Sequence, residues 1–224
     1  MIYLHYIYIN IILGELILED SLNITLIHCV ILREGGPERA EPQNPAHEAL
    51  AGEILVRACP DIFVTQSSDI LREYREYERM STTALNAYVG PRVRNYLERL
   101  GGHLDNGDFT GQVQIMRSNG GTMSLDQART EPVSMMESGP VAGMIGAGHL
   151  ANILGYAQCI GFDMGGTTAK TSMFRGGQPA IHENYYIGSY ASGQPLQLPV
   201  VDIMEIGAGG GSIAWVDGHG SIHV

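Results

Sequence analysis

Two glycine-rich stretches near the carboxyl terminus carry the residue types best suited to chemistry. In the first, residues 160–174, an apolar run reaches Asp163 and continues as Gly165-Gly166 and Thr167-Thr168. Adjacent glycines let a backbone bend so that its N–H groups converge on an anion, and threonine hydroxyls donate to the same oxygens. A carboxylate at the base of such a turn binds Mg²⁺ directly or through water. We predict a β-hairpin that binds a nucleotide through Asp163, Gly165, Gly166, Thr167 and Thr168, with Asp163 also the metal ligand.

Two other nucleotide loops are excluded by the residues around these glycines. A Walker loop requires a Gly-Lys-[Ser/Thr] step, which this stretch lacks. A dinucleotide-binding loop opens a helix, whereas residues 171–174 predict a returning strand. A glycine turn that binds no ligand remains the alternative interpretation.

The second stretch, residues 206–212, places Gly207, Gly209, Gly210 and Gly211 before Ser212. We predict that these glycines expose backbone donors to the nucleotide or to a reacting group. A flexible loop between strands is the alternative. The following residues predict a hairpin, 213–216 and 221–224, with its turn at Asp217-Gly218.

Other polar side chains nearby have weaker claims. Asp202 and Glu205 precede the second loop and are candidates for a metal ligand or general base, although residues three apart need not converge. His149 and His182 stand alone and are expected to be structural or surface residues. No residue is a convincing hydrolytic nucleophile.

The elements that would position these loops follow from glycine, proline and apolar spacing. Residues 138–148 predict a helix opened by Pro140, whose glycines and alanines indicate close packing against a neighbouring helix. Residues 113–117 predict a strand ending in a tight turn at 118–121, and residues 126–129 predict a helical turn.

The preceding part of the chain predicts two longer helices. One begins at Asn44-Pro45 and ends before Pro60, with a strand at 62–65. The other covers residues 81–100, is kinked or split at Pro91 and is closed by Gly101-Gly102. Between them, residues 72–79 alternate charges and predict a solvated, self-paired surface, with an interface or a substrate-proximal loop as the alternative. Residues 81–83, Ser-Thr-Thr, are expected to cap the second helix.

Residues 1–32 differ from the rest because they contain no Lys or Arg and are rich in β-branched and aromatic residues. A signal peptide is excluded, since the basic start and small-residue cleavage site are absent. Three interpretations remain: buried strands, a segment foreign to this domain, and a membrane anchor. Residues 33–45 predict a linker, so we expect an atypical segment at 1–43 and a domain at 44–224.

Composition excludes several classes of protein. Lys plus Arg total 13 and Asp plus Glu total 24, so the formal net charge of the 224 residues is −11. This balance argues against nucleic acid and against anionic membrane surfaces as partners. Three scattered cysteines argue against a disulfide framework or a cysteine-built zinc site. Low charge (17%) and 29 glycines favour an intracellular α/β domain with many tight turns.

Taken in order, these motifs resemble the hydantoinase A/oxoprolinase family. The resemblance covers about residues 44–224 and is carried by Asn-Pro-Ala-His-Glu (44–48), Arg-Glu-Tyr-Glu-Arg-Met-Ser-Thr-Thr-Ala-Leu-Asn-Ala-Tyr (75–88), Met-Arg-Ser-Asn-Gly-Gly (116–121), Ser-Gly-Pro-Val-Ala-Gly (138–143), Phe-Asp-Met-Gly-Gly-Thr-Thr (162–168) and residues 206–215.

The resemblance implies an α/β chain with part of an actin-like ATPase (ribonuclease H-like) fold, a mixed sheet and flanking helices. It implies ATP and Mg²⁺ as cofactors, a cytoplasmic location, a hydantoinase B-type partner subunit or domain, and no nucleic-acid or membrane partner. The implied activity is ATP-driven opening of a cyclic amide or imide such as hydantoin or 5-oxoproline. The Asp163 hairpin would be the second phosphate loop, and the helix from Ser138 would connect the lobes. An ATP-dependent ketone carboxylase subunit and a non-catalytic truncated remnant are the alternatives.

The chain also departs from the family pattern. Nothing in residues 1–43 resembles the first phosphate hairpin, and family members continue beyond the position of Val224. These departures suggest a fragment or truncated product. In addition, Ala169-Lys170 replaces the more common polar-Asp step, so a metal role for that aspartate is lost.

Overall fold

The computed structural model describes residues 29–30, 45–73, 75–183, 185–188 and 193–224. The chain divides into two compact units. Unit 1 comprises Met1–Ile115, Met123–Ser134 and Asn184–Leu198; unit 2 comprises Met116–Thr122, Met135–Glu183 and Pro199–Val224. The interpretations of residues 1–28 and 31–43, and the boundary drawn at residue 43, lie outside the described residues. Of residues 1–32 the structure describes Cys29–Val30, which is a strand and agrees with the first of the three interpretations.

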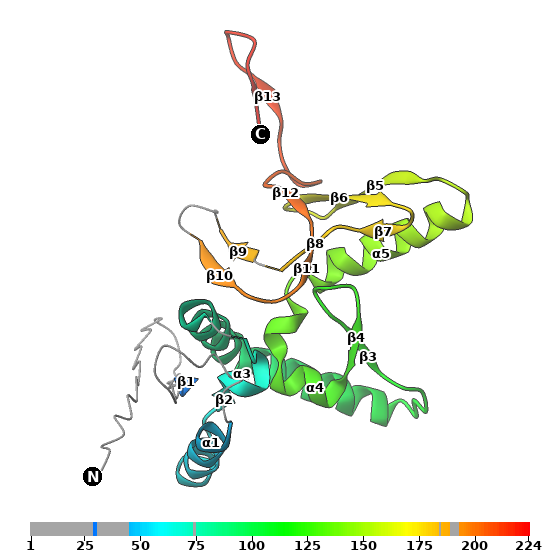
Figure 1. Ribbon diagram of the computed structural model, residues 1–224. Coiled ribbons are helices and arrows are strands. Elements are labelled where there is room, and N and C mark those ends of the chain that lie inside the picture. The colour runs from blue at the N-terminus through cyan, green and yellow to red at the C-terminus, as the bar shows by residue number, and fades with distance from the viewer. Residues whose placement is uncertain (1–28, 31–44, 74, 184, 189–192) are drawn as a thin grey trace. The chain divides into compact units, whose positions relative to one another are not determined.

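Unit 1 is built around one long helix, α3 (Glu76–Asn106). The shorter helices α2 and α4 and the strand β10 contact it, and α1 contacts β2 (Figure 1). The remaining elements of this unit are α1 (Ala46–Ala58), α2 (Ser67–Ile70), α4 (Leu125–Thr130), the parallel pair β1 (Cys29–Val30) and β2 (Thr65–Gln66), and the antiparallel pair β9 (Tyr185–Ile187) and β10 (Gln194–Leu196).

Helix α3 is longer than the sequence predicts. It begins before Ser81, passes through Pro91 without splitting, and continues beyond Gly101-Gly102. A proline inside a helix removes a hydrogen bond and costs about 3 kcal/mol. Packing of α3 against its neighbours offsets this cost; the ring of Phe63, for example, fills the space beside Gly90. Tertiary contacts therefore override local helix breakers here.

Several buried side chains of α3 are polar, which corrects the expectation for Arg79 and for residues 81–83. The other described residues of 72–78 are mostly exposed, and Arg75 pairs with Glu78, as expected for a solvated, self-paired surface. Arg79 is 2% exposed, and its Nη2 lies 2.7 Å from Glu48 Oε1. Ser81 and Thr82 lie inside the helix and do not cap it. The Ser81 hydroxyl donates to the carbonyl of Pro195, and Thr82 Oγ1 accepts from the amide of Gln197 at 2.9 Å. These side chains join α3 to the β10 segment.

Unit 2 contains the predicted hairpin as an antiparallel pair, β5 (Gln158–Met164) and β6 (Ala169–Arg175). The strand β12 (Met204–Ile206) extends the sheet in the order β12-β6-β5, and β7 (Gln178–Pro179) also pairs with β6. Helix α5 (Ser138–Ile153) packs along β5 (Figure 1). Two smaller antiparallel pairs follow: β8 (Ile181–His182) with β11 (Val200–Val201), and β13 (Trp215–Val216) with β14 (Ile222–His223).

A further two-stranded hairpin is formed by β3 (Gln114–Met116) and β4 (Thr122–Ser124). The predicted tight turn at 118–121 is present, with Gly120 at a φ of 85°. The helical turn at 126–129 is α4, capped by the Ser124 hydroxyl. The turn at Asp217 is also confirmed, although Gly220 supplies the positive φ of 83° there.

The small residues of α5 pack against the sheet, so the expectation of a neighbouring helix is wrong. Phe174 is fully buried, and a methyl group added at Gly148 would lie 2.5 Å from its ring. A methyl group at Gly161 of β5 would lie 2.5 Å from the sulfur of Met144. Glycine allows this close approach of helix and sheet. Gly143 and Gly146, by contrast, face open space within the described part of the chain.

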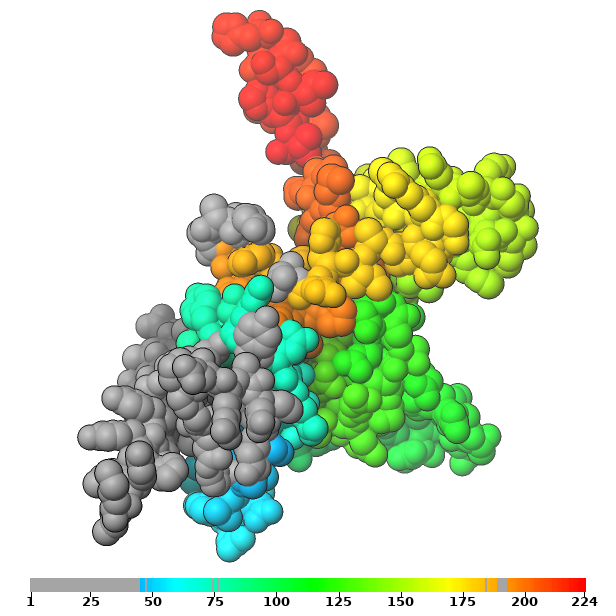
Figure 2. Space-filling view, viewed as in Figure 1, coloured from blue at the N-terminus to red at the C-terminus, as the bar shows by residue number. Residues whose placement is uncertain are grey.

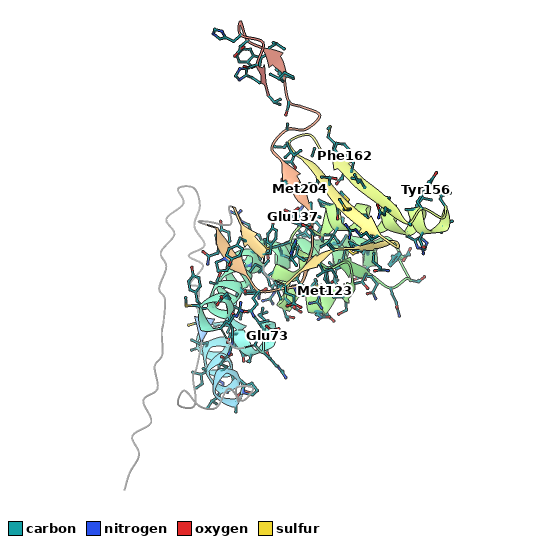
Figure 3. All side chains as sticks on the ribbon, turned by 45° about the horizontal axis from the view of Figure 1, so that its top comes forward. Glu73, Met123, Glu137, Tyr156, Phe162 and Met204 are labelled. Atoms are coloured by element: carbon teal, nitrogen blue, oxygen red, sulfur yellow. The ribbon has the colours of Figure 1, made fainter. Side chains whose placement is uncertain are left out.

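The sheet face opposite α5 is apolar and exposed. In the space-filling view β6 and β7 (yellow) lie at the surface beside α5 (yellow-green) (Figure 2). Figure 3 labels Phe162 and Met204, which belong to the side chains of this face and are 63% and 72% exposed. The face also carries a groove of about 620 Å³. Its lining includes Ile160, Met173, Arg175, Asp202 and Met204.

Candidate functional site

The two glycine-rich stretches lie against each other in unit 2. The amide of Gly210 donates to the carbonyl of Gly165 at 2.9 Å, and the amide of Gly211 donates to the carbonyl of Gly166 at 2.8 Å. Residues separated by more than 40 positions in sequence therefore form one double loop. We call residues 165–168 the hairpin tip and residues 207–212 the second loop.

Glycine is required in the second loop because the backbones approach so closely. A Cβ added at Gly209 would lie 2.7 Å from the carbonyl oxygen of Gly165 and from the amide nitrogen of Thr168. A Cβ at Gly211 would lie 2.9 Å from the Gly166 oxygen. In contrast, Gly165 and Gly166 do not have positive φ angles. The backbone freedom expected at the tip is thus less important than close approach from the second loop.

The hydrogen bonds narrow the set of amides that can meet an anion. Those of Gly210 and Gly211 are used between the loops, Gly209 donates to Ser212 Oγ at 2.9 Å, and Gly165 donates to the Thr168 carbonyl at 3.0 Å. Within the described residues, the amides of Gly166 and Thr167 have no acceptor. Two adjacent free donors at the tip form a small anion-binding concavity. The second loop therefore supports the tip through two amides, those of Gly210 and Gly211, and Gly207 lies exposed after β12.

Charged side chains form a row across three strands below the double loop. In the strand register, Asp163 of β5 and Glu205 of β12 both stand opposite Lys170 of β6. Residues paired in register point to the same face of a sheet, so these three side chains share the α5 face. The row is carboxylate, ammonium, carboxylate.

Lys170 is the centre of this row, and sequence reasoning assigned it no role. Its Nζ lies 2.7 Å from Glu205 Oε1, 3.6 Å from Glu137 Oε2 and 3.2 Å from Thr168 Oγ1. Glu137, labelled in Figure 3, precedes α5. The hydrogen bond to Glu205 raises the pKa of Lys170, and the same bond lowers the pKa of Glu205. The signal in the sequence was the alternation of β6, which places Lys170 on the same face as Asp163.

The side chains of Asp202 and Glu205 do not converge on one site. Their spacing of three residues had left this open. Asp202 Oδ1 lies 3.2 Å from Nε2 of the exposed His182, whereas Glu205 pairs with Lys170. A joint metal or general-base role for the two carboxylates therefore has no geometric support. His182 and His149 are exposed, which agrees with a surface role.

The residues around Asp163 fit a magnesium–phosphate complex but not an all-protein metal cage. Among the described residues, no group of three or more His, Cys, Asp or Glu side chains is arranged to hold a metal. Mg²⁺ commonly takes one or two carboxylates and completes its shell with water and phosphate oxygens. The exposed Asp163, close in the chain to the free amides of the tip, matches that donor set. A magnesium ion there would depend on the phosphate it accompanies.

Comparison with known proteins places this site in a family. A model of the hydantoinase/oxoprolinase family matches residues 79–224. The chain therefore belongs to this family.

Relatives with and without an assigned activity share most of the chain. An uncharacterized protein of Methanocaldococcus jannaschii is 41% identical over 190 residues, which are 81% of this chain and 28% of that protein. The caprolactamase subunit alpha of Pseudomonas jessenii is 31% identical over 182 residues, 81% of this chain and 26% of the subunit.

Solved structures give the same result. A nucleotide-free structure of acetone carboxylase, from a study of ATP-dependent acetone carboxylation, superposes with a TM-score of 0.67 at 27% identity, covering 80% of this chain and 25% of that one. The ATP-dependent caprolactamase from Pseudomonas jessenii gives a TM-score of 0.63 at 31% identity, covering 78% of this chain and 25% of that one. The chain thus spans about a quarter of the length of these proteins. No helix among the described residues is both long and apolar enough to cross a membrane.

Proposed function

We propose that the chain is part of an ATP-dependent amidohydrolase subunit that opens a cyclic amide or imide of the hydantoin or 5-oxoproline type. The observation that carries this proposal is the double loop. Its tip offers the free amides of Gly166 and Thr167. Asp163 of β5 is paired in register with Lys170 of β6. Family membership and the caprolactamase relative, whose name denotes a lactam substrate, support a cyclic amide.

In this proposal unit 2 is part of an actin-like ATPase fold, and the hairpin tip is one of two phosphate loops. Bound ATP would supply a phosphoryl group that turns the carbonyl of a stable amide into a better electrophile for water. The amides of Gly166 and Thr167 and the hydroxyls of Thr167 and Thr168 hold the phosphate oxygens. Asp163 would hold Mg²⁺, which would neutralise charge on the phosphate. The second loop, through Gly209 and Gly211, fixes the shape of the tip.

A hydrolytic nucleophile is not among the residues assigned here, so the proposal includes a partner subunit or domain of the hydantoinase B type. The names of the relatives agree with an assembly, because caprolactamase subunit alpha and acetone carboxylase beta subunit both denote components.

One observation favours a second function, an ATP-dependent ketone carboxylase subunit. The acetone carboxylase structure has the higher of the two TM-scores, 0.67 against 0.63. Both activities would use the same phosphate site. Turnover of hydantoins, 5-oxoproline and caprolactam, compared with that of acetone and acetophenone in bicarbonate, separates the two once the partner is present.

The first test is calorimetric titration of the chain with Mg²⁺·ATP, alongside Asp163→Ala. We expect micromolar binding to the unmodified chain and a loss of at least about tenfold in affinity in the variant, equivalent to about 1.4 kcal/mol. Asp202→Ala is the matched control, because this exposed carboxylate pairs with His182. Equal affinities in all three proteins would contradict the assignment of Asp163, and no binding to a folded chain would reject the half-site as a nucleotide site.

A further inference from the structure

The row Asp163, Lys170, Glu205 lies where both glycine loops leave the sheet. Lys170 is two residues after Thr168, and Glu205 is two residues before Gly207. We propose that Lys170 is a positioning residue: through its bridge to Glu205 it holds the second loop against the hairpin tip. This inference rests on the proposed phosphate site for its purpose, but its geometric content can be tested without a nucleotide.

The backbone connection between these strands is short. The register of β12 and β6 contains three residue pairs, Met204 with Thr171, Glu205 with Lys170, and Ile206 with Ala169. Beyond Ile206 the second loop meets the tip through the amides of Gly210 and Gly211. A strand of three residues with exposed side chains has few contacts to keep it in place. A side-chain bridge in the middle pair is therefore well placed to prevent β12 from separating.

The environment of Lys170 favours a positioning role over direct contact with phosphate. An ammonium group has three donors. Three acceptors surround Nζ: Glu205, Thr168 and Glu137. The lysine side chain is only 12% exposed, so its head is held among these groups and away from solvent. Nζ donates to Thr168 Oγ1, and the Thr168 side chain also hydrogen-bonds to Glu205, which helps to lower the pKa of that carboxyl, so Thr168 belongs to the same bridge.

Neutralising Glu205 distinguishes an effect of charge from a positioning role, because the two predict opposite changes in the affinity for an anion. Removal of a carboxylate near a phosphate site strengthens anion binding if only the electrostatic potential matters. If the bridge positions the loop, Glu205→Gln weakens binding despite the favourable change in charge. Glu137→Gln is the informative comparison, since Glu137 is the more distant partner at 3.6 Å and lies outside both loop-bearing strands.

The decisive measurement is amide hydrogen exchange of the nucleotide-free chain. We expect the amides of Gly210 and Gly211 to exchange about fivefold faster in Lys170→Met and Glu205→Gln, because both lose the bridge that keeps the loops together. Lys170→Arg should stay within about twofold of the unmodified chain, since a guanidinium also reaches a carboxylate. Amides of β5 and α5 should not change, which shows that the variants are folded. Unchanged exchange at Gly210 and Gly211 in the two bridge variants would overturn the proposal.

Titration of the same variants with Mg²⁺·ATP is the second experiment. We expect Glu205→Gln to bind about fivefold more weakly and Glu137→Gln to bind at least as well as the unmodified chain. Tighter binding by Glu205→Gln would also overturn the positioning role. If the unmodified chain binds no nucleotide, the proposed function fails, while faster exchange in the bridge variants would still support the role of Lys170. Should Lys170→Met fail to fold, Glu205→Gln probes the same bridge from the other strand.

Discussion

The two units bury different kinds of side chain. Unit 1 buries charged and polar groups on α3, where Arg79 meets Glu48 and the Asn86 amide donates to Thr65 Oγ1 and the carbonyl of Thr130. Unit 2 buries Phe174 against glycines of α5 and β5, and the Glu205 side chain of its Lys170–Glu205 ion pair is 42% exposed. Hydrogen bonds of precise geometry thus specify unit 1, whereas shape complementarity specifies the helix–sheet contact of unit 2. The consequence is a different response to substitution.

The largest expected effect is in unit 1, from Glu48→Ala. The glutamate accepts from Arg79, from the Ser67 hydroxyl at 2.7 Å and from the Ser68 amide at 2.8 Å, so its loss leaves a buried guanidinium unpaired. Breaking such a buried pair costs about 3–5 kcal/mol. Urea unfolding measures it. The exposed pair Arg94–Glu98 is the control, and Glu98→Ala should cost less than about 1 kcal/mol. Similar costs at both sites would break the contrast between buried and exposed pairs.

Asn86→Ala should have the next largest effect. Its Oδ1 also accepts from the amide of Val133 at 3.0 Å, so one side chain satisfies two backbone groups of residues 130–133 as well as the Thr65 hydroxyl. Leaving buried partners unsatisfied costs about 1–3 kcal/mol. Asn95→Ala on the exposed side of the same helix is the comparison and should change the free energy of unfolding by less than about 0.5 kcal/mol. A neutral Asn86→Ala would show that unit 1 does not depend on its polar core.

In unit 2 the matched pair is Gly148→Ala and Gly146→Ala in helix α5. The methyl group at 148 would lie 2.5 Å from the Phe174 ring, and overpacking of this kind costs about 1–3 kcal/mol. At position 146 the methyl group meets open space, so helix propensity should stabilise the protein by up to about 1 kcal/mol. Thermal unfolding of both variants measures the opposite signs. Equal shifts would show that α5 does not depend on glycine at its contact with the sheet.

The smallest effect is the pH dependence of the Lys170–Glu205 pair. Because the pKa of Glu205 is lowered from 4.5 in the folded state, the stability from this group is present above pH 4.5 and is lost as the pH falls through the folded pKa. The pKa of Lys170 is raised from 10.5, so its contribution is present below pH 10.5 and is lost above it.

Glu205 is 42% exposed, so solvent screening limits the pair to less than about 1 kcal/mol. The free energies of unfolding of the unmodified chain and of Lys170→Met should therefore differ at pH 7 and converge as the pH falls below 4.5 and through the lowered pKa of Glu205. A constant difference between pH 7 and pH 3 would contradict this assignment. Added salt should reduce the same difference, whereas it should hardly affect the buried Arg79–Glu48 pair.

Local signals predicted the elements close to the candidate site. An apolar run and a glycine turn predicted the β5–β6 hairpin, and Pro140 predicted the helix that is α5. Local sequence signals gave wrong predictions where residues far apart in the sequence determine the structure. Pro91 and Gly101 read locally as helix breakers, yet packing along α3 keeps both inside the helix. Arg79 read as a surface charge because its partner Glu48 is 31 residues away.

Within the site, too, local sequence signals predicted some residue roles, and contacts between distant residues determined the others. Residue types and spacing pointed to Asp163 and to both glycine loops, and an apolar strand ending at a carboxylate before two glycines suffices for that. The stacking of the loops, the use of the Gly210 and Gly211 amides, and the pairing of Glu205 with Lys170 were not foreseeable. Each depends on the register of β12 with β6, which brings together residues about 35 positions apart.

By itself, the sequence determined the chemical inventory of this protein and its family: an aspartate, adjacent glycines and threonines on a hairpin, in the order shared with hydantoinase/oxoprolinase proteins. Tertiary structure decided which of these groups remain free. Hydrogen bonds between the loops leave the amides of Gly166 and Thr167 as donors, and the strand register turns Lys170 toward two carboxylates. The physical reason is that hydrogen bonds and ion pairs act over a few ångströms, and only the folded chain brings distant residues that close.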